Sequence, residues 1–316
     1  MPQTLAIVLP VFAVILLGYG VGKTRLFGDE GIRALTNFCY HVTIPALLFR
    51  SMAKLDAPHG DALLIAVAFY AAVLATFCVA MAAGRLLFRL NLAEQALFGV
   101  GATYGNILLL GLPLSITAFG ERAVLPASAL LALQSPILFT LTALVVESGR
   151  GAGGKSGVPA VLRSAALSLV TTPVIVAMIA GIAWGMTGLG LDPVLDQTLA
   201  FLGQAATPSA LFALGASLTR FKLGGDMKQV AALGVLKLLV LPIATFVSAQ
   251  YVFGLAPLHV AVATLCGATP TGVTAFVLAM RYDTLVARIA ASVIVTCALA
   301  WAIAAGLLAY FLPRIG

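Results

Sequence analysis

The stretch that decides the fold is TYGNILLLGLPLS, residues 103–115, where an asparagine, two glycines and a proline interrupt an apolar run. It falls inside an apolar segment, residues 95–118, and at 1.5 Å per residue Asn106 lies roughly 16 Å from its start. Proline inside a helix lacks an N–H donor and clashes with the preceding turn, while Gly105 and Gly111 allow backbone angles that other residues avoid. We therefore expect this helix to kink or unwind between Asn106 and Pro113.

The rest of the sequence has the composition of a polytopic membrane protein. Of its 316 residues, 61% are hydrophobic and 9% charged, against about a quarter charged in ordinary globular domains, and the mean hydropathy is +1.09. Apolar segments long enough to cross about 30 Å of hydrocarbon recur along the chain, and each must satisfy its own backbone as a helix. We predict an all-α membrane protein with ten transmembrane helices at residues 4–22, 34–53, 62–84, 95–118, 124–147, 165–187, 198–218, 229–253, 258–280 and 286–311.

The net charge of +7 is distributed unevenly between the connections. Thirteen of the 18 basic residues follow the first, third, fifth, seventh and ninth predicted helices: Lys23, Arg25, Arg33, Arg85, Arg89, Arg150, Lys155, Arg163, Arg220, Lys222, Lys228, Arg281 and Arg288. The positive-inside rule then places both termini on the non-cytoplasmic side of the membrane. We expect a multi-pass protein of a bacterial-type inner membrane. Because this bias explains the charge, we expect a lipid bilayer as the surrounding partner and no nucleic acid.

The chain also contains an internal repeat at an offset of 163 residues. LPVFAVILLGYGVG (9–22) aligns with TPVIVAMIAGIAWG (172–185), and IPALLF (44–49) aligns with TPSALF (207–212). Each copy holds five predicted helices, so the second copy enters the membrane upside down, as in secondary transporters. We predict a first repeat at residues 1–147, a Gly-rich cytoplasmic linker at 148–163 and a second repeat at 164–316.

The ninth predicted helix has a matching interruption in CGATPTGVTAF, residues 266–276. Thr269 followed by Pro270 is typical of an N-cap and first helical position, and Gly272 follows closely. A half-helix that starts at this depth would point its free N–H groups and positive dipole end at the membrane centre, which favours an anion. One such kink often serves packing alone, but two at repeat-related positions indicate a binding site.

Four stretches resemble the auxin efflux carrier family, which includes bacterial malonate and malate carriers and the plant auxin exporters. They are IPALLFRS (44–51), GNILLLGLPLSITAFG (105–120), LQSPILFTLTALVVE (133–147) and ATPTGVTAFVLAMRY (268–282). The resemblance extends along nearly the whole chain. It implies a fold like that of NhaA and the bile-acid transporters, with helices one, two, six and seven as a scaffold, helices three to five and eight to ten as a transport domain, and helices four and nine crossing at the site.

The resemblance also implies a homodimer, and it implies that Asn106 and Gln134 face the substrate. Together with residues of the two interruptions, the predicted substrate-binding set is Asn106, Gln134, Thr269, Pro270, Thr271 and Leu48, with the crossover breaks at Gly105, Gly111, Pro113, Pro270 and Gly272. The plant exporters carry a serine where this chain has Leu48 and a long loop where it has a short linker. A small carboxylate such as malonate or malate is therefore favoured over an auxin-like acid as the substrate.

Four polar residues inside predicted helices allow two interpretations each. Asn106 and Gln134 either satisfy carbonyls freed by the break or hydrogen-bond a carboxylate. Lys237 either snorkels to the cytoplasmic surface or faces the interior as a counter-charge to the helix C-terminal ends or the bound anion. His41 is a conceivable proton-coupling group, although packing is the simpler interpretation.

The function predicted from these features is secondary transport of a small organic anion by alternating access. An anion channel of the same architecture and a membrane sensor that binds a carboxylate are the alternatives; an enzyme is disfavoured because neither a nucleophile motif nor paired intramembrane acids appear. Proton coupling and uniport driven by the membrane potential both remain open. We expect no cofactor and no metal site, and we expect buried, reduced thiols at Cys39, Cys78, Cys266 and Cys297.

Overall fold

The computed structural model describes residues 2–24, 28–54, 61–149, 163, 167 and 171–315, and within them every regular element is helical. The first half contains α1 (Pro2–Gly22), α2 (Asp29–Phe38), η1 (Cys39–Thr43), α3 (Ile44–Ala53), α4 (Asp61–Phe88), α5 (Leu92–Thr103), η2 (Ile107–Gly111), α6 (Leu112–Phe119), η3 (Gly120–Ala123) and α7 (Val124–Gly149). The predicted linker at 148–163 falls almost entirely outside the described residues.

The second half contains α9 (Pro173–Met186), α10 (Pro193–Gln204), α11 (Ala206–Ser217), η5 (Leu218–Arg220), α12 (Met227–Val235), η6 (Leu236–Val240), α13 (Leu241–Val247), η7 (Ser248–Val252), α14 (Pro257–Gly267), α15 (Val273–Arg281) and α16 (Val286–Ile315). By length and composition, six described stretches qualify as membrane spans. They are Leu5–Gly22, Leu63–Phe88, Ile107–Val146, Pro193–Arg220, Met227–Val252 and Val286–Ile315. Interruptions shorten other helices, so that α14 has 11 residues and α15 has 9.

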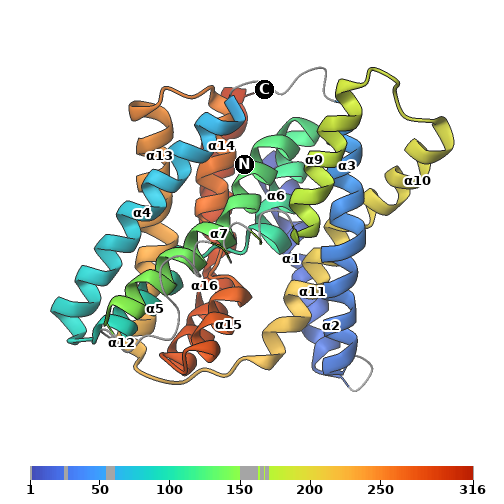
Figure 1. Cartoon of the computed structure of the whole chain (residues 1–316). Helices are drawn as coiled ribbons and strands as arrows, with labels where there is room; N and C mark the ends of the chain where they lie inside the picture. The colour runs from blue at the N-terminus through green and yellow to red at the C-terminus, as the bar shows by residue number, and fades with distance from the viewer. Residues whose placement is uncertain are drawn as a thin grey trace.

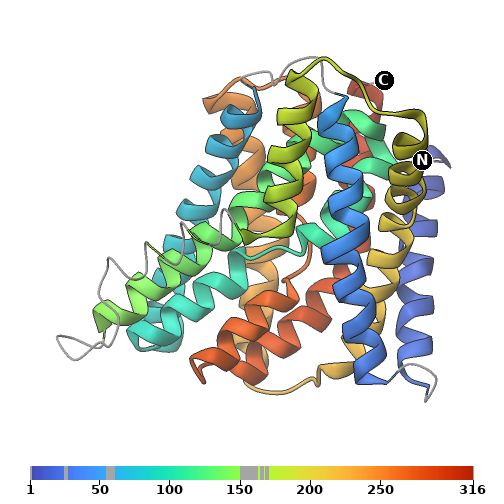
Figure 2. The ribbon, with the colours of Figure 1, turned by 45° about the vertical axis from the view of Figure 1, so that its right-hand side comes forward.

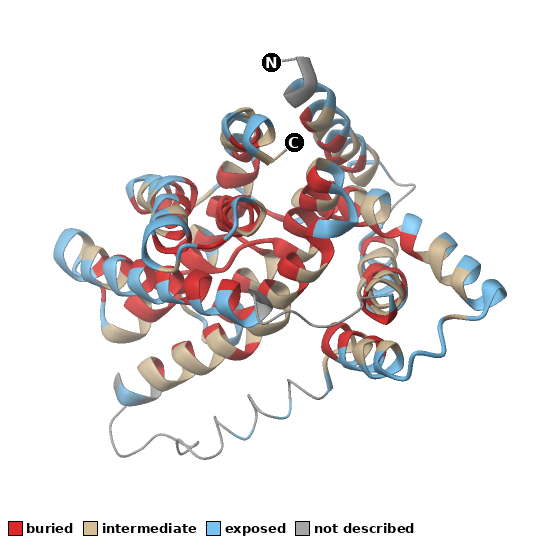
Figure 3. Cartoon of the chain, turned by 90° about the horizontal axis from the view of Figure 1, so that it is seen from above, coloured by how far each residue is buried: buried red, intermediate tan, exposed pale blue. Residues whose placement is uncertain are grey.

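The helices fall into two groups side by side. In Figure 1, α3, α9, α10 and α11 gather on one side, α4, α5, α12 and α13 on the other, and α14, α15 and α16 lie between them. The start of α1 and the end of α16 lie toward the same end of the molecule (Figure 2). Seen from above, the buried residues concentrate in the middle, and the exposed ones lie on the outer surface (Figure 3).

Glycines allow α1 to pack closely against α11, and α9 against α3. A Cβ on Gly22 would lie 3.0 Å from Cα of Ala216, so α1 touches the backbone of α11. A Cβ on Gly185 would lie 3.2 Å from the carbonyl oxygen of Ala53, so α9 touches α3 in the same way. At both interfaces the glycine lets one helix approach the backbone of the other.

Proline is accommodated inside three helices by a preceding π-helical turn. Residues 39–43, 107–111 and 236–240 are π-helical, and each run ends just before Ile44–Pro45, Leu112–Pro113 or Leu241–Pro242. In each run the residue before the proline donates its N–H to the carbonyl five residues back. The wider turn moves the carbonyls that the proline ring would otherwise meet. Pro113 therefore lies within α6, and the chain breaks before it rather than at it.

The four cysteines are free thiols, but they are not all buried. Cys39, Cys266 and Cys297 are buried, whereas Cys78 is exposed on α4. The prediction of a buried thiol at Cys78 is therefore wrong. An apolar helix whose outer face meets lipid can expose a small hydrophobic residue there without cost, because the solvent on that side is itself apolar.

Candidate functional site

The two interrupted helices meet each other through their unwound backbone. Between α5 and η2 the chain is non-helical at Tyr104, Gly105 and Asn106, and between α14 and α15 it is non-helical at residues 268–272. The Asn106 N–H donates to the Pro270 carbonyl at 2.9 Å, and the Gly272 N–H donates to the Tyr104 carbonyl at 2.9 Å. Gly105 and Thr271 thereby form an isolated antiparallel bridge. We call residues 104–106 and 268–272 the crossing.

Glycines occur at the crossing because the opposing chain leaves no room for a side chain. A Cβ on Gly105 would collide with Oγ1 of Thr269 and lie 3.3 Å from Nζ of Lys237. A Cβ on Gly272 would lie 2.9 Å from the Tyr104 ring. Gly111 has an ordinary helical backbone with φ of −61°, so the expectation that it provides unusual angles is wrong. A Cβ there would lie 3.0 Å from the methyl of Thr269.

The Asn106 side chain has one hydrogen-bonded atom, Oδ1, and one atom without a partner, Nδ2. Its Oδ1 accepts from the Leu109 N–H at 3.2 Å and so caps η2. Because that neighbour is a donor, the atom facing it must be the oxygen, and the amide nitrogen faces elsewhere. The side chain is 6% exposed, and Nδ2 is among the buried polar atoms of the described chain that have no hydrogen-bond partner. A buried donor without an acceptor is costly and is suited to a ligand that supplies one.

The other polar groups at the crossing hold the breaks in place. Nε2 of Gln134, on α7, donates to the Gly105 carbonyl at 2.8 Å. The Thr269 hydroxyl donates to the Cys266 carbonyl at 2.7 Å, and the Thr271 hydroxyl donates to the Gly101 carbonyl at 3.0 Å. All three side chains are buried. In this conformation they satisfy carbonyls that the interrupted helices leave open.

The half-helix after the second break starts later than the sequence suggests. Its N-cap is Gly272, with no side-chain cap, and α15 begins at Val273. The expectation that Thr269 is the N-cap and Pro270 the first helical residue is therefore wrong. Thr269 and Pro270 instead lie in the unwound segment, where the Pro270 carbonyl is needed for pairing with Asn106. The start of α15 and the start of η2 both remain at the crossing, each with the positive end of a helix.

Lys237 lies beside the paired backbone, where α14 ends. Its side chain is 0% exposed, so it does not snorkel to the surface. Nζ donates to the carbonyl of Gly267, the last residue of α14, at 2.6 Å. Helix C-termini carry partial negative charge, and a cation there is stabilising. The crossing therefore has two helix N-termini and a free amide donor, with a buried amine beside Gly105.

Several polar groups near the crossing escaped the sequence analysis. The Tyr104 hydroxyl shares a hydrogen bond of 2.6 Å with the Ser135 hydroxyl, and the Tyr104 ring stacks on Phe139 with centroids 6.1 Å apart. Oγ1 of Thr296, on α16, accepts from the Thr271 N–H at 3.0 Å. Tyr104 and Ser135 could have been identified from their positions, because they adjoin Gly105 and Gln134 in sequence.

Two residues named from the sequence lie outside the crossing. Leu48 is fully buried on α3, a helix that packs against α9 and α10. His41 lies in η1 with an exposed side chain. Its Nδ1 is 3.1 Å from the Asn37 carbonyl, and its ring meets Tyr40 edge to face. These contacts match the packing interpretation of His41.

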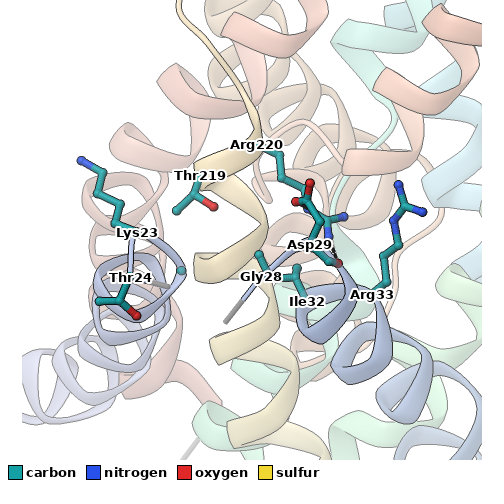
Figure 4. Close-up of a pocket in the computed structure, with 9 residues that line it drawn as sticks. Lys23, Thr24, Gly28, Asp29, Ile32, Arg33, Thr219 and Arg220 are labelled. Atoms are coloured by element: carbon teal, nitrogen blue, oxygen red, sulfur yellow. Dashed lines mark hydrogen bonds and ion pairs between the residues drawn. The ribbon is translucent and has the colours of Figure 1, made fainter. Parts of the chain in front are cut away.

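A cavity of about 500 Å³ opens far from the crossing, at the end of α1 and the start of α2 (Figure 4). Arg220 and Asp29 face each other in it, with Nε 2.9 Å from Oδ1. Lys23 points away from that pair toward the Tyr19 ring, 4.6 Å from its centroid. We do not assign the substrate to this cavity, because Arg220 and Asp29 already pair with each other and most of the lining residues are exposed at the surface. Among the described residues, no group of three or more His, Cys, Asp or Glu side chains comes together to hold a metal.

Comparison with known proteins gives one family and several full-length relatives. A family model described as "Membrane transport protein" matches residues 4–308. A Rhizobium meliloti (strain 1021) protein named "Putative malonate transporter" is 28% identical over 320 residues, covering 100% of this chain and 98% of that protein. An "Uncharacterized transporter YfdV" of Escherichia coli (strain K12) is 23% identical over 281 residues, covering 87% of each. An "Uncharacterized transporter" of Methanothermobacter thermautotrophicus is 25% identical over 279 residues, covering 87% and 88%.

Proposed function

The chain belongs to the membrane transport protein family of auxin efflux carriers, and from that premise we propose that it is a secondary transporter of a small organic anion. The substrate class is a mono- or dicarboxylate such as malonate or malate. The name of the Rhizobium relative supports a small dicarboxylate. The same family membership makes it a multi-pass membrane protein, and we place it in a bacterial-type inner membrane as a homodimer with both termini outside the cytoplasm.

The observation that carries this proposal is the unpaired Nδ2 of Asn106 beside two helix N-termini. A carboxylate oxygen would accept from Nδ2 and be stabilised by the positive ends of η2 and α15. A cationic or purely apolar ligand would leave the donor unpaired. Gln134, Thr269 and Thr271 would then position the breaks that carry these groups. Their hydrogen bonds to backbone carbonyls support that role.

The proposed architecture is two inverted repeats of five helices whose broken members cross at the site. The glycine contacts support it. Gly18 and Gly22 of α1 meet Phe212 and Ala216 of α11, and shifting each residue by 163 positions gives the contacts of α9 with α3. Gly181 meets Phe49, and Gly185 meets Ala53. Two interfaces related by one sequence offset are expected if the halves share a fold.

The burial of the site supports alternating access. Asn106, Gln134 and Thr269 are all buried in this conformation, so a substrate reaches them only after part of the protein moves. We propose that α4–α7 and α12–α16 move as a transport domain against a scaffold of α1–α3 and α9–α11. The helices of the scaffold are joined through the close glycine contacts, which supports their acting as one body.

Counterflow in proteoliposomes tests this function against a channel and a sensor. Vesicles loaded with unlabelled malonate should take up external labelled malonate transiently above its equilibrium level, and uptake should saturate. A channel would give flux that does not saturate and no counterflow, and a sensor would give no flux. Malate and a monocarboxylate would be compared in the same assay, with empty vesicles as the control. Uptake that does not depend on internal substrate would contradict the proposal.

A further inference from the structure

Lys237 is the one charged side chain in the buried core of the described chain, and it has no ion-pair partner among the recorded pairs. Those pairs join Arg50 to Asp196 and Glu121, Lys54 to Asp196, and Arg220 to Asp29. At Lys237 the recorded acceptor is instead a backbone carbonyl, that of Gly267. An isolated ammonium removed from water is costly, and a group in this position escapes that cost by releasing its proton.

The neighbours of η6 leave this amine without a carboxylate at its own depth. η6 packs against α4, α5, α12, α13 and α16. The charged residues of these elements occupy their first or last turns: Asp61, Arg85, Glu94, Lys228, Arg288 and Arg314. The other titratable residues of these elements and of α14 are Tyr70, Cys78, His259, Cys266, Cys297 and Tyr310, of which Cys266 is close enough to interact electrostatically with Lys237. A second charge at this depth must therefore come with the ligand.

The contact with Gly267 can persist in either protonation state. A neutral amine and an ammonium both donate hydrogen bonds, so the 2.6 Å contact does not require the charge. The negative end of α14 favours the ammonium. The stabilisation from a helix end is nevertheless smaller than the desolvation cost of a buried charge. An anion bound by Asn106 at the crossing adds a full negative charge close to Nζ, which lies beside the preceding residue, Gly105.

We propose that Lys237 is the proton-binding group that couples transport of the carboxylate to movement of a proton. The amine is neutral when the site is empty and becomes an ammonium when the carboxylate binds, so one proton enters with each anion and leaves with it. By linkage, the proton and the anion each raise the affinity for the other by the same factor. A monocarboxylate would then cross without net charge, and a dianion with a net charge of −1. This inference rests on the proposed function.

Calorimetry on the purified wild-type protein tests the proposal without any variant. Binding of malonate, malate and a monocarboxylate would be measured at about pH 8, where carboxylates are ionised, in buffers of different ionisation enthalpy. We expect uptake of about one proton per bound anion, and an affinity that falls at least about fivefold between about pH 7 and about pH 9. Binding in which the heat is the same in every buffer would overturn the proposal.

Two substitutions separate a proton carrier from a fixed charge. Lys237→Arg holds a charge that is not lost in this range, so binding should continue with no buffer-dependent proton uptake, and uptake into vesicles should no longer respond to a pH gradient. Lys237→Met should also lose proton uptake and should bind the anion more weakly. Lys228→Met, at the exposed start of α12, is the matched control and should behave as wild type. Proton uptake that persists in Lys237→Met would assign the proton to another group and overturn the proposal.

The two proposals fail in different ways. If a carboxylate binds and undergoes counterflow with the membrane potential clamped, yet a pH gradient changes neither its rate nor its accumulation in wild type, the proton coupling is wrong and the transport function stands. If no carboxylate binds or moves, the proposed function is wrong, and the role of Lys237 falls with it. Should Lys237→Arg fail to fold, the wild-type calorimetry and Lys237→Met still decide the question.

Discussion

Gly105, Gly111 and Gly272 show how single residues determine the crossing. Each faces another part of the chain so closely that a Cβ would meet Thr269 or Tyr104. Their role is therefore close approach of two backbones, which lets Asn106 and Gly272 donate to Pro270 and Tyr104 across the gap. Once the backbones pair, the Asn106 amide caps η2 with its oxygen, and its nitrogen has no hydrogen-bond partner in the protein.

Gly105→Ala should destabilise the protein because the added methyl collides with Thr269 and crowds Lys237. We expect a loss of about 1–3 kcal/mol in the free energy of unfolding, typical of overpacking in a filled core. Thermal unfolding in detergent measures it. Gly234→Ala on α12 is the control, because nothing lies within 4 Å of its added Cβ, and it should be neutral or stabilising by up to about 1 kcal/mol. Equal melting temperatures for the two variants would contradict this explanation of Gly105.

At the scale of elements, the sequence predicts the positions of the helix breaks better than it predicts their structure. Proline and glycine in residues 103–115 and 266–276 locate both interruptions to within a few residues, because these residue types act locally. The pairing of the two breaks joins residues more than 160 apart, which no local signal reports. The π-helical turns before Pro45, Pro113 and Pro242 were also invisible, because local propensity does not distinguish a kink from a widened turn.

For the side chains at the site, the sequence likewise predicts which residues matter but not which groups they contact. Asn106 and Lys237 stand out in sequence because polar groups are rare in apolar helices. The sequence cannot decide which carbonyl each one meets, and for Gln134 that carbonyl is Gly105 on another helix. The exposure of Cys78 likewise depends on which face of α4 meets lipid. That face is set by the packing of neighbouring helices.

Gly181→Val should separate α9 from α3, because a Cβ there would already lie 2.6 Å from the Phe49 carbonyl oxygen. We expect a loss of at least about 1–3 kcal/mol in unfolding free energy. Gly18→Val should cost a similar amount by separating α1 from α11, if the two interfaces are equivalent by repeat. Gly20→Val, on the exposed face of α1 with nothing within 4 Å, is the control. Thermal unfolding measures all three. A melting temperature for Gly181→Val equal to that of Gly20→Val would refute close packing as the role of Gly181.

At the scale of the whole molecule, one ionic cluster joins the first and second halves of the chain. Arg50 on α3 makes two hydrogen bonds to Asp196 on α10, at 2.7 and 3.2 Å, and Lys54 lies 2.8 Å from the same carboxylate. Arg50 also lies 3.6 Å from Glu121 in η3. The Asp196 side chain is 26% exposed and the Glu121 side chain 79% exposed. The two carboxylates should therefore contribute differently to stability, since an exposed pair is worth little.

Asp196→Asn should lower the melting temperature because it weakens a bidentate pair with Arg50 and a second contact with Lys54. Glu121→Gln should leave the melting temperature nearly unchanged. In the proposed motion, Arg50 and Asp196 both belong to the scaffold, whereas Glu121 moves with the transport domain. Glu121→Gln should accordingly change the rate of exchange more than stability. The reverse order of melting temperatures would show that the contact with Glu121, rather than that with Asp196, contributes more to stability.

The central claim, that the crossing binds a carboxylate through Asn106, is tested most directly by thermal stability against a panel of carboxylates. Wild type should be stabilised in a concentration-dependent way, by about 2.7 kcal/mol at roughly 100 times Kd. Asn106→Asp keeps the cap on η2 but replaces the Nδ2 donor with a negative charge, so its shift should vanish. Asn91→Asp makes the same change at the exposed capping box of α5 and should respond as wild type. The account would be contradicted if cations or neutral solutes raised the melting temperature and no carboxylate did. It would also be contradicted if a carboxylate raised the melting temperature of Asn106→Asp as much as that of wild type.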